Sequence, residues 1–194
     1  MTRVCVDFET TGLPINGARP GIVQIAAVKY SGFRRGLPAF GEDEEVIAET
    51  DDYDTFQVML DPELPPNEVW HPKAIAATGI GPEEVKGCAT FFEVFPDFAK
   101  FVLGCDTWVG YNTPFDITIL QMSLERYGFV THFPWPYHQL DVMPMAKAAM
   151  NVTKGYTLSD AYEFVTGKEL DGAHDAMVDV TATIAILKGL EDGQ

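Results

Sequence analysis

Two periods of apolar residues divide the chain into expected strands and helices. Runs that are continuously apolar or alternate every second residue predict strands over residues 3–8, 22–30, 55–60 and 107–111, with a further short strand ending near Asp141. Helical spacing predicts helices over residues 67–78, 90–103, 114–127, 142–150, 158–166 and about 175–189. Pro96 predicts a kink or a late start in the second of these helices. Three early strands followed by alternating helices and strands favour an α/β fold, in which helices cover a mixed sheet.

The length and composition of the chain favour one ordinary globular domain. The 194 residues are 46% hydrophobic and 12% aromatic, which argues against disorder, and we expect a single domain over residues 1–194. No apolar run approaches the roughly 20 residues of a membrane span. The chain enters a strand at once, without a signal-peptide pattern, and its three cysteines include no close pair. We therefore expect a cytoplasmic protein with reduced cysteines and no membrane contact.

The net charge of −16 disfavours a protein that binds nucleic acid through a broad basic face. Part of the excess lies in an acidic insertion at about residues 33–54, where many Asp and Glu residues follow one another. We interpret this insertion as a solvated loop or hairpin edge, because the glycine and ligand spacing of an EF-hand is absent. Bound cations would reverse the sign of the charge locally, so the composition remains compatible with a metal-dependent nuclease.

The first strand carries two carboxylates on one face. Asp7 and Glu9 are two residues apart, so in a strand both side chains point the same way, with Cys5 in line. Two buried acids repel each other unless a cation lies between them, and the alternative is a strand end that runs out into solvent. The residues that follow, Thr10, Thr11, Gly12 and Leu13, form either an ordinary turn or a backbone segment that comes close to a ligand.

A third carboxylate lies where a strand runs into a helix. In the segment 109–116, Asn112 or Thr113 can cap the helix and Pro114 suits its first turn. Asp116 then lies in that first turn, beside the end of the strand, where α/β sheets often hold ligands. The alternative interpretation is an acid that only complements the helix dipole.

The last predicted helix brings a histidine and a fourth carboxylate. His174 and Asp179 are five residues apart and would be about 140° out of phase on one helix. They converge only if His174 lies in the preceding loop or first turn while Asp179 lies inside the helix. Asp179 has apolar neighbours and needs a partner, whereas His174 alone could be a surface histidine.

These stretches resemble the three motifs of the DnaQ-like DEDDh exonuclease family. Residues 6–12 resemble the first motif, residues 110–116 the second, and His174-x-Ala176-x-x-Asp179 the third. The connecting segments are also similar, so the resemblance covers nearly the whole chain. Tyr111 and Thr78 differ from residues common in the family. The resemblance implies a ribonuclease H-like mixed sheet of about five strands, the first three antiparallel, flanked by helices.

The resemblance also implies a two-metal 3′→5′ exonuclease. Asp7, Glu9, Asp116 and Asp179 would bind two Mg²⁺ or Mn²⁺ ions, and His174 would take the proton of the attacking water. Substrate contacts would come from Thr10, Thr11, Gly12, Leu13, Asn112 and Phe115. For Leu13 and Phe115 core packing is the alternative, and Asp141 is expected to cap a helix. The expected product is a 5′-mononucleotide.

The substrate and partners stay less defined at this stage. The expected substrate is the 3′ end of single-stranded DNA, with RNA as an alternative, because the 2′-OH is read by fine geometry. A DNA polymerase is an alternative partner, in proofreading or DNA repair. A catalytically silent interaction module is the competing hypothesis, although all five motif residues are present.

Overall fold

The computed structural model describes residues 1–31, 53–66, 68–154 and 156–193. Five strands form one sheet: β1 (Thr2–Thr10), β2 (Ile22–Ser31), β3 (Asp54–Met59), β4 (Thr107–Gly110) and β5 (His138–Asp141). The helices are α1 (Pro72–Thr78), α2 (Phe91–Val102), α3 (Thr113–Tyr127), α4 (Val142–Met150), α5 (Leu158–Thr166) and α6 (Ala176–Asp192). Among the described helices, none has the length and apolar character needed to cross a membrane.

The sheet is mixed and has the order β3-β2-β1-β4-β5. β2 pairs antiparallel with both β1 and β3, while β4 pairs parallel with β1 and with β5. The predicted α/β class, the five strands and the antiparallel start of the sheet are therefore confirmed. Most of the acidic insertion at 33–54 lies outside the described residues, which resume at Tyr53.

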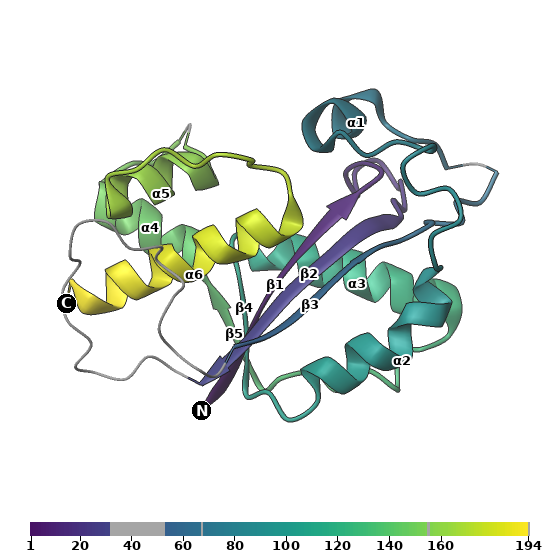
Figure 1. Cartoon of the computed structure of the whole chain (residues 1–194), viewed down its shortest axis with the longest axis horizontal. Coiled ribbons are helices and arrows are strands. Elements are labelled where there is room, and N and C mark those ends of the chain that lie inside the picture. The colour runs from purple at the N-terminus through teal and green to yellow at the C-terminus, as the bar shows by residue number, and fades with distance from the viewer. Residues whose placement is uncertain (32–52, 67, 155, 194) are drawn as a thin grey trace.

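Helices cover both faces of the sheet, and the alternation of β1 assigns its side chains to them (Figure 1). Val4, Val6 and Phe8 point into a core shared with α2 and α3. Cys5 points into the opposite core, which α4, α5 and α6 complete. Because side chains alternate along a strand, Asp7 and Glu9 lie on the α6 side, in line with Cys5.

Two predicted helix boundaries are wrong, one for a local reason and one because of a contact with another helix. The helix predicted over 67–78 begins only at Pro72, because His71 adopts the extended conformation (φ −85°, ψ 123°) favoured before a proline. The last helix continues past Gly189 to Asp192. A Cβ at Gly189 would come within 2.2 Å of Val165 Cγ1, so this glycine allows α6 to pass close to α5 rather than ending the helix.

The helix around Pro96 begins before the proline. Thr90 caps it through a reciprocal pair of bonds with Glu93, and the helix then runs through Pro96, whose side chain is exposed. The predicted late start is therefore wrong. Its apolar side packs Phe91, Phe95 and Phe98 against the sheet and α3.

Candidate functional site

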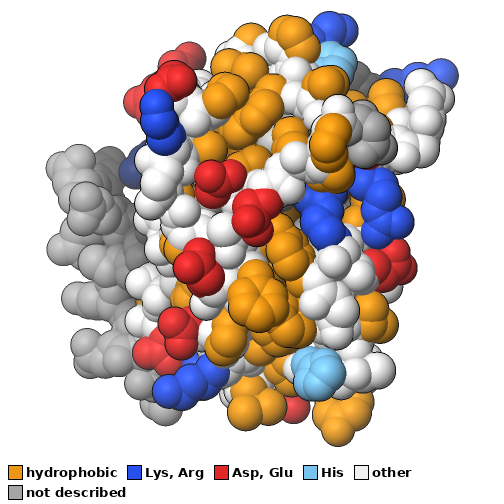
Figure 2. Space-filling view, turned by 90° about the vertical axis from the view of Figure 1, so that its right-hand side faces the viewer, with side chains coloured by type: hydrophobic (Ala, Val, Ile, Leu, Met, Phe, Trp, Pro, Cys, Tyr) orange, Lys and Arg blue, Asp and Glu red, His pale blue; other side chains and the backbone are white. Residues whose placement is uncertain are grey.

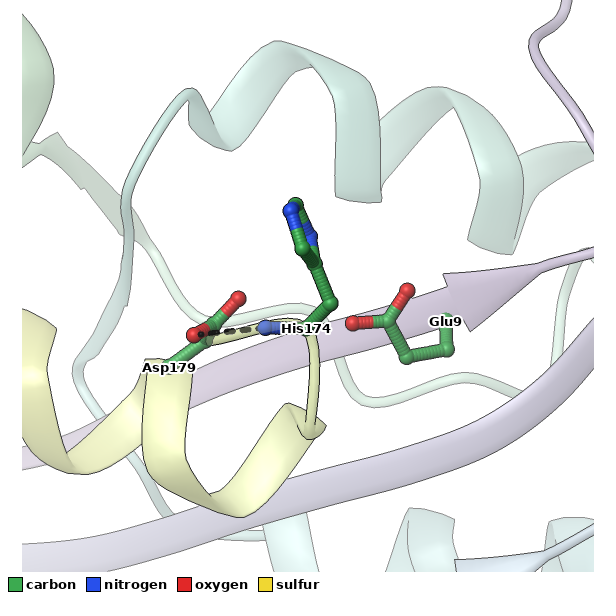
Figure 3. A group of neighbouring side chains, drawn as sticks. All are labelled: Glu9, His174 and Asp179. Carbon is green, nitrogen blue, oxygen red and sulfur yellow. Dashed lines mark hydrogen bonds between the residues drawn. The ribbon is translucent and has the colours of Figure 1, made fainter. Parts of the chain in front are cut away.

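The end of β1 and the start of α6 meet at a group of three side chains. Glu9, His174 and Asp179 each offer a ligand atom, and these atoms all lie within 4.8 Å of one another. Figure 3 shows the carboxylates of Glu9 and Asp179 on either side of His174, with the imidazole projecting away from the ribbon between them. Residues from the two ends of the chain therefore share one site.

The loop before α6 produces the predicted convergence of His174 and Asp179. His174 precedes the helix and has a left-handed backbone (φ 72°), which is uncommon for a residue with a side chain. Its backbone N–H donates to Asp179 Oδ1 over 3.4 Å, and Asp179 lies in the first turn of α6. The condition set by the five-residue spacing, a loop histidine and a helical aspartate, is met.

The short strand β4 explains how Asp116 reaches the site. β4 pairs with β1 only from Arg3 to Cys5, so the following part of β1 lies next to the first turn of α3. There Asp116, only 2% exposed, accepts a hydrogen bond from the backbone N–H of Phe8 over 3.2 Å. The expected position of Asp116 in the first turn of a helix is confirmed.

The four carboxylates Asp7, Glu9, Asp116 and Asp179, hereafter the carboxylate cluster, repel one another as ions. Burial raises the pKa of Asp7 well above its usual range, and the negative charges of Asp116, Asp179 and Glu9 add to this. Burial, followed by the charges of Asp179 and Asp175, raises the pKa of Glu9 to about 8. Burial also raises the pKa of Asp116 and Asp179, against hydrogen bonds from the backbones of Phe8 and His174 respectively.

These raised pKa values predict how the stability of the protein depends on pH without metal. Between pH 4.5 and about 8 the folded state keeps a proton on Glu9 that the unfolded chain releases. Stability therefore falls as pH rises through this window. We expect the melting temperature in EDTA to fall toward pH 8, and Mg²⁺ to raise it most at the alkaline end.

Thermal denaturation of Glu9→Gln isolates this effect from the general charge of the protein. The variant should lose part of the pH dependence, whereas Glu169→Gln, a change at an exposed glutamate, should retain it. A metal-free melting temperature that rises across the window in the unmodified protein would contradict the assignment.

The loop after β1 is held by bonds within the protein. The Thr10 hydroxyl donates to the Gly12 carbonyl over 2.7 Å, and Thr11, 1% exposed, accepts from the Gly21 N–H through its hydroxyl. The Thr11 carbonyl accepts from the His71 N–H. Both threonine side chains therefore form hydrogen bonds within the loop. Leu13, which follows them, is 58% exposed.

The other predicted contact residues divide between surface and core. Asn112 is exposed and left-handed (φ 67°), and it occupies the N-cap position of α3, one of the two predicted positions, although its side chain makes no capping bond. Its backbone N–H instead donates to Asp141 Oδ1, which also caps α4 as expected. Phe115 is partly buried against the core between the sheet and α3.

Sequence reasoning missed three residues around the site. His71 caps α1 through its Nδ1, and its Cβ lies 3.2 Å from where a Cβ on Gly12 would be. Asp175 caps α6, and Gln24 bonds to it from β2. The available signals were a polar residue within an apolar strand and a polar residue directly before a helix.

Comparisons with known proteins concern the family and the fold of the chain. A sequence model described as exonuclease matches residues 4–187. No curated protein matches the chain.

Two similar solved structures are both of exonuclease I. One, a structure that suggests how exonuclease I achieves processivity, has a TM-score of 0.74 and 21% identity over 98% of this chain. The other, the E. coli enzyme in complex with a dA16 oligonucleotide, has a TM-score of 0.73 and 21% identity over 100% of this chain. This chain covers 41% of each of those chains, and at such identity the similarity shows the shared fold. With the family match over almost its whole length, the chain belongs to the exonuclease family, the DnaQ-like nucleases of the ribonuclease H-like superfamily.

Proposed function

We propose that this protein is a metal-dependent 3′→5′ exonuclease that removes 5′-mononucleotides from single-stranded nucleic acid, preferably DNA. The observation that carries the proposal is the meeting of Glu9, His174 and Asp179 within 4.8 Å. Asp7 and Asp116 support it, because the charges of Asp116, Asp179 and Glu9 all raise the pKa of Asp7, which places Asp7 and Asp116 close to these residues. Residues 1–194 would act as a single domain.

The carboxylate cluster suits hard divalent cations. It offers only oxygen ligands, the donor type that Mg²⁺ and Mn²⁺ prefer, and its members resist ionisation in the absence of positive charge. Asp7, Glu9, Asp116 and Asp179 would hold two such ions. When bound, the ions would supply positive charge that offsets the cluster and stabilises charge developing on the phosphodiester oxygens.

His174 is suited to take a proton beside this charge. Its side chain is exposed, so a water molecule and the end of a substrate can reach the imidazole. An imidazole is the side chain most often used as a general base, and that of His174 lies beside Glu9 and Asp179. His174 would therefore act as the general base.

The loop of residues 10–13 is suited to receive the terminal nucleotide. Internal hydrogen bonds hold Thr10, Thr11 and the Gly12 carbonyl, which leaves the backbone N–H of Gly12 and the exposed side chain of Leu13, shortly after Glu9 in the chain. Leu13 can pack against an unstacked base, which a single-stranded end presents and a duplex end does not. We assign Asn112 and Phe115 to the other side of the same nucleotide.

The distribution of charge favours short-range recognition of the strand end. On the face drawn in Figure 2, acidic side chains lie among hydrophobic ones, and basic side chains are scattered rather than aligned. Binding that depends on few phosphate contacts varies weakly with salt. The complex of E. coli exonuclease I with dA16 supports DNA as the preferred substrate.

Labelled oligonucleotides test the proposal directly. With Mg²⁺ or Mn²⁺, a 3′-labelled single strand should release a labelled mononucleotide at once, whereas a 5′-labelled strand should shorten stepwise. EDTA should abolish both results, and duplex DNA should react more slowly. A faster reaction of RNA would change the substrate class. An absence of metal-dependent release from every substrate would refute the proposed activity.

A further inference from the structure

Gln24 connects the middle strands of the sheet to the loop that carries His174. It lies on β2 directly opposite Glu9 of β1, so both side chains project from the same face. It is 4% exposed and is the only polar residue in the run Ile22–Val28. A buried carboxamide needs partners for both of its ends.

Both ends of the Gln24 carboxamide bond to the start of α6. Its Nε2 donates to Asp175 Oδ2 over 3.3 Å, and its Oε1 accepts from the backbone N–H of Ala176 over 3.2 Å. Asp175 uses its other oxygen, Oδ1, to accept from Met177 and Val178 in the first turn. Gln24, Asp175 and the first turn of α6 thus form one bonded unit.

This unit lies next to a non-glycine residue with a left-handed backbone. His174, with φ 72°, is bonded covalently to Asp175, and a left-handed residue of this kind persists only where its surroundings hold it. The Gln24 bonds fix the two residues that follow His174. His174 itself donates through its backbone N–H to Asp179 Oδ1.

We propose that Gln24 is a positioning residue that sets the place of the His174 imidazole relative to Glu9 and Asp179, acting through Asp175 and Ala176. The proposal rests on the assignment of His174 as the general base. A carboxamide fits because it offers one donor and one acceptor, whereas a carboxylate offers only acceptors. It also adds no further negative charge beside Glu9 and Asp175.

The first test removes both hydrogen bonds while keeping the volume of the side chain. For Gln24→Leu we expect kcat to fall about 10- to 100-fold, as for partners that orient groups of a metal site, with KM nearly unchanged. Gln57→Leu, at a glutamine exposed on the neighbouring strand β3, is the matched control and should leave kcat unchanged. In a His174→Ala background, Gln24→Leu should cause no further loss.

The second test exchanges the two chemical groups across the bond. Gln24→Glu alone places two carboxylates together and should lower kcat. Gln24→Glu combined with Asp175→Asn restores a donor and an acceptor, keeps the net charge, and should recover most of the lost kcat. A purely structural role would lower the melting temperature of the single variants without separating kcat from KM.

The third test does not depend on activity. In the metal-free protein, Gln24→Leu should speed hydrogen exchange of the Ala176 amide and shift the NMR resonances of the His174 ring. If kcat is unchanged in Gln24→Leu although His174→Ala is inactive, the proposal is overturned. The unmodified protein could lack nuclease activity altogether, which would refute the proposed function. In that case unchanged hydrogen exchange and ring resonances in Gln24→Leu would also overturn the positioning role of Gln24. Changed exchange and resonances would still support that role.

Discussion

Asp7→Asn is expected to remove most of the activity while making the metal-free protein more stable. The loss of several kcal/mol of metal-dependent charge stabilisation corresponds to about 10³–10⁵ in kcat. Mn²⁺ affinity should fall in parallel, as calorimetry would measure. The melting temperature in EDTA at neutral pH should rise, because burial and four neighbouring carboxylates oppose the ionised form of Asp7.

The opposite signs of the two effects separate a metal ligand from a structural residue. A carboxylate that served only the fold would lower activity and melting temperature together when replaced. Asp97→Asn, at an exposed aspartate of α2, provides the control and should change neither quantity. Unchanged Mn²⁺ affinity in Asp7→Asn would show that Asp7 lies outside the metal site.

His174→Ala is expected to lower kcat by about 10²–10⁴, the usual contribution of a general base. Because Asp7, Glu9, Asp116 and Asp179 all remain, Mn²⁺ binding should be retained, which distinguishes this variant from Asp7→Asn. Stopped-flow or gel measurements of single turnovers would show the loss in the chemical step itself.

An exposed histidine elsewhere calibrates that experiment. His132 is exposed in the turn after α3, where its ring contacts Phe129, and His132→Ala should have the kcat of the unmodified protein. Near-normal turnover in His174→Ala would refute the role of His174 as the general base and would mean that another group takes the proton.

The sequence predicted those parts of the site that depend on local periodicity. Asp7 and Glu9 share a face because a strand alternates, and Asp116 lies in a first turn because a Pro follows a capping position. These features require no knowledge of distant residues. The strand and helix types were predicted for the same reason, and the errors concern boundaries, as at Pro72 and Gly189.

What the sequence did not reveal depends on contacts between distant segments. Gln24 and Asp175 are 151 residues apart, and each alone resembles an ordinary strand or cap residue. Asn112 or Thr113 was expected to cap α3, and Asn112 does occupy the N-cap position, but it bonds through its backbone N–H to Asp141 of the next strand and not through its side chain. Such pairings follow from the order of the strands in the sheet, which local patterns do not encode.

The pairing of β4 with β1 ends at Cys5, and this early end has a consequence for how such proteins can diverge. If β4 were one or two residues longer, it would pair with β1 as far as Phe8. The backbone N–H of Phe8 would then bond to β4 and no longer to Asp116. Insertions at this junction should therefore inactivate the protein even when every ligand is kept. The number of residues between β4 and α3 is therefore as constrained as the identity of the residues in the carboxylate cluster.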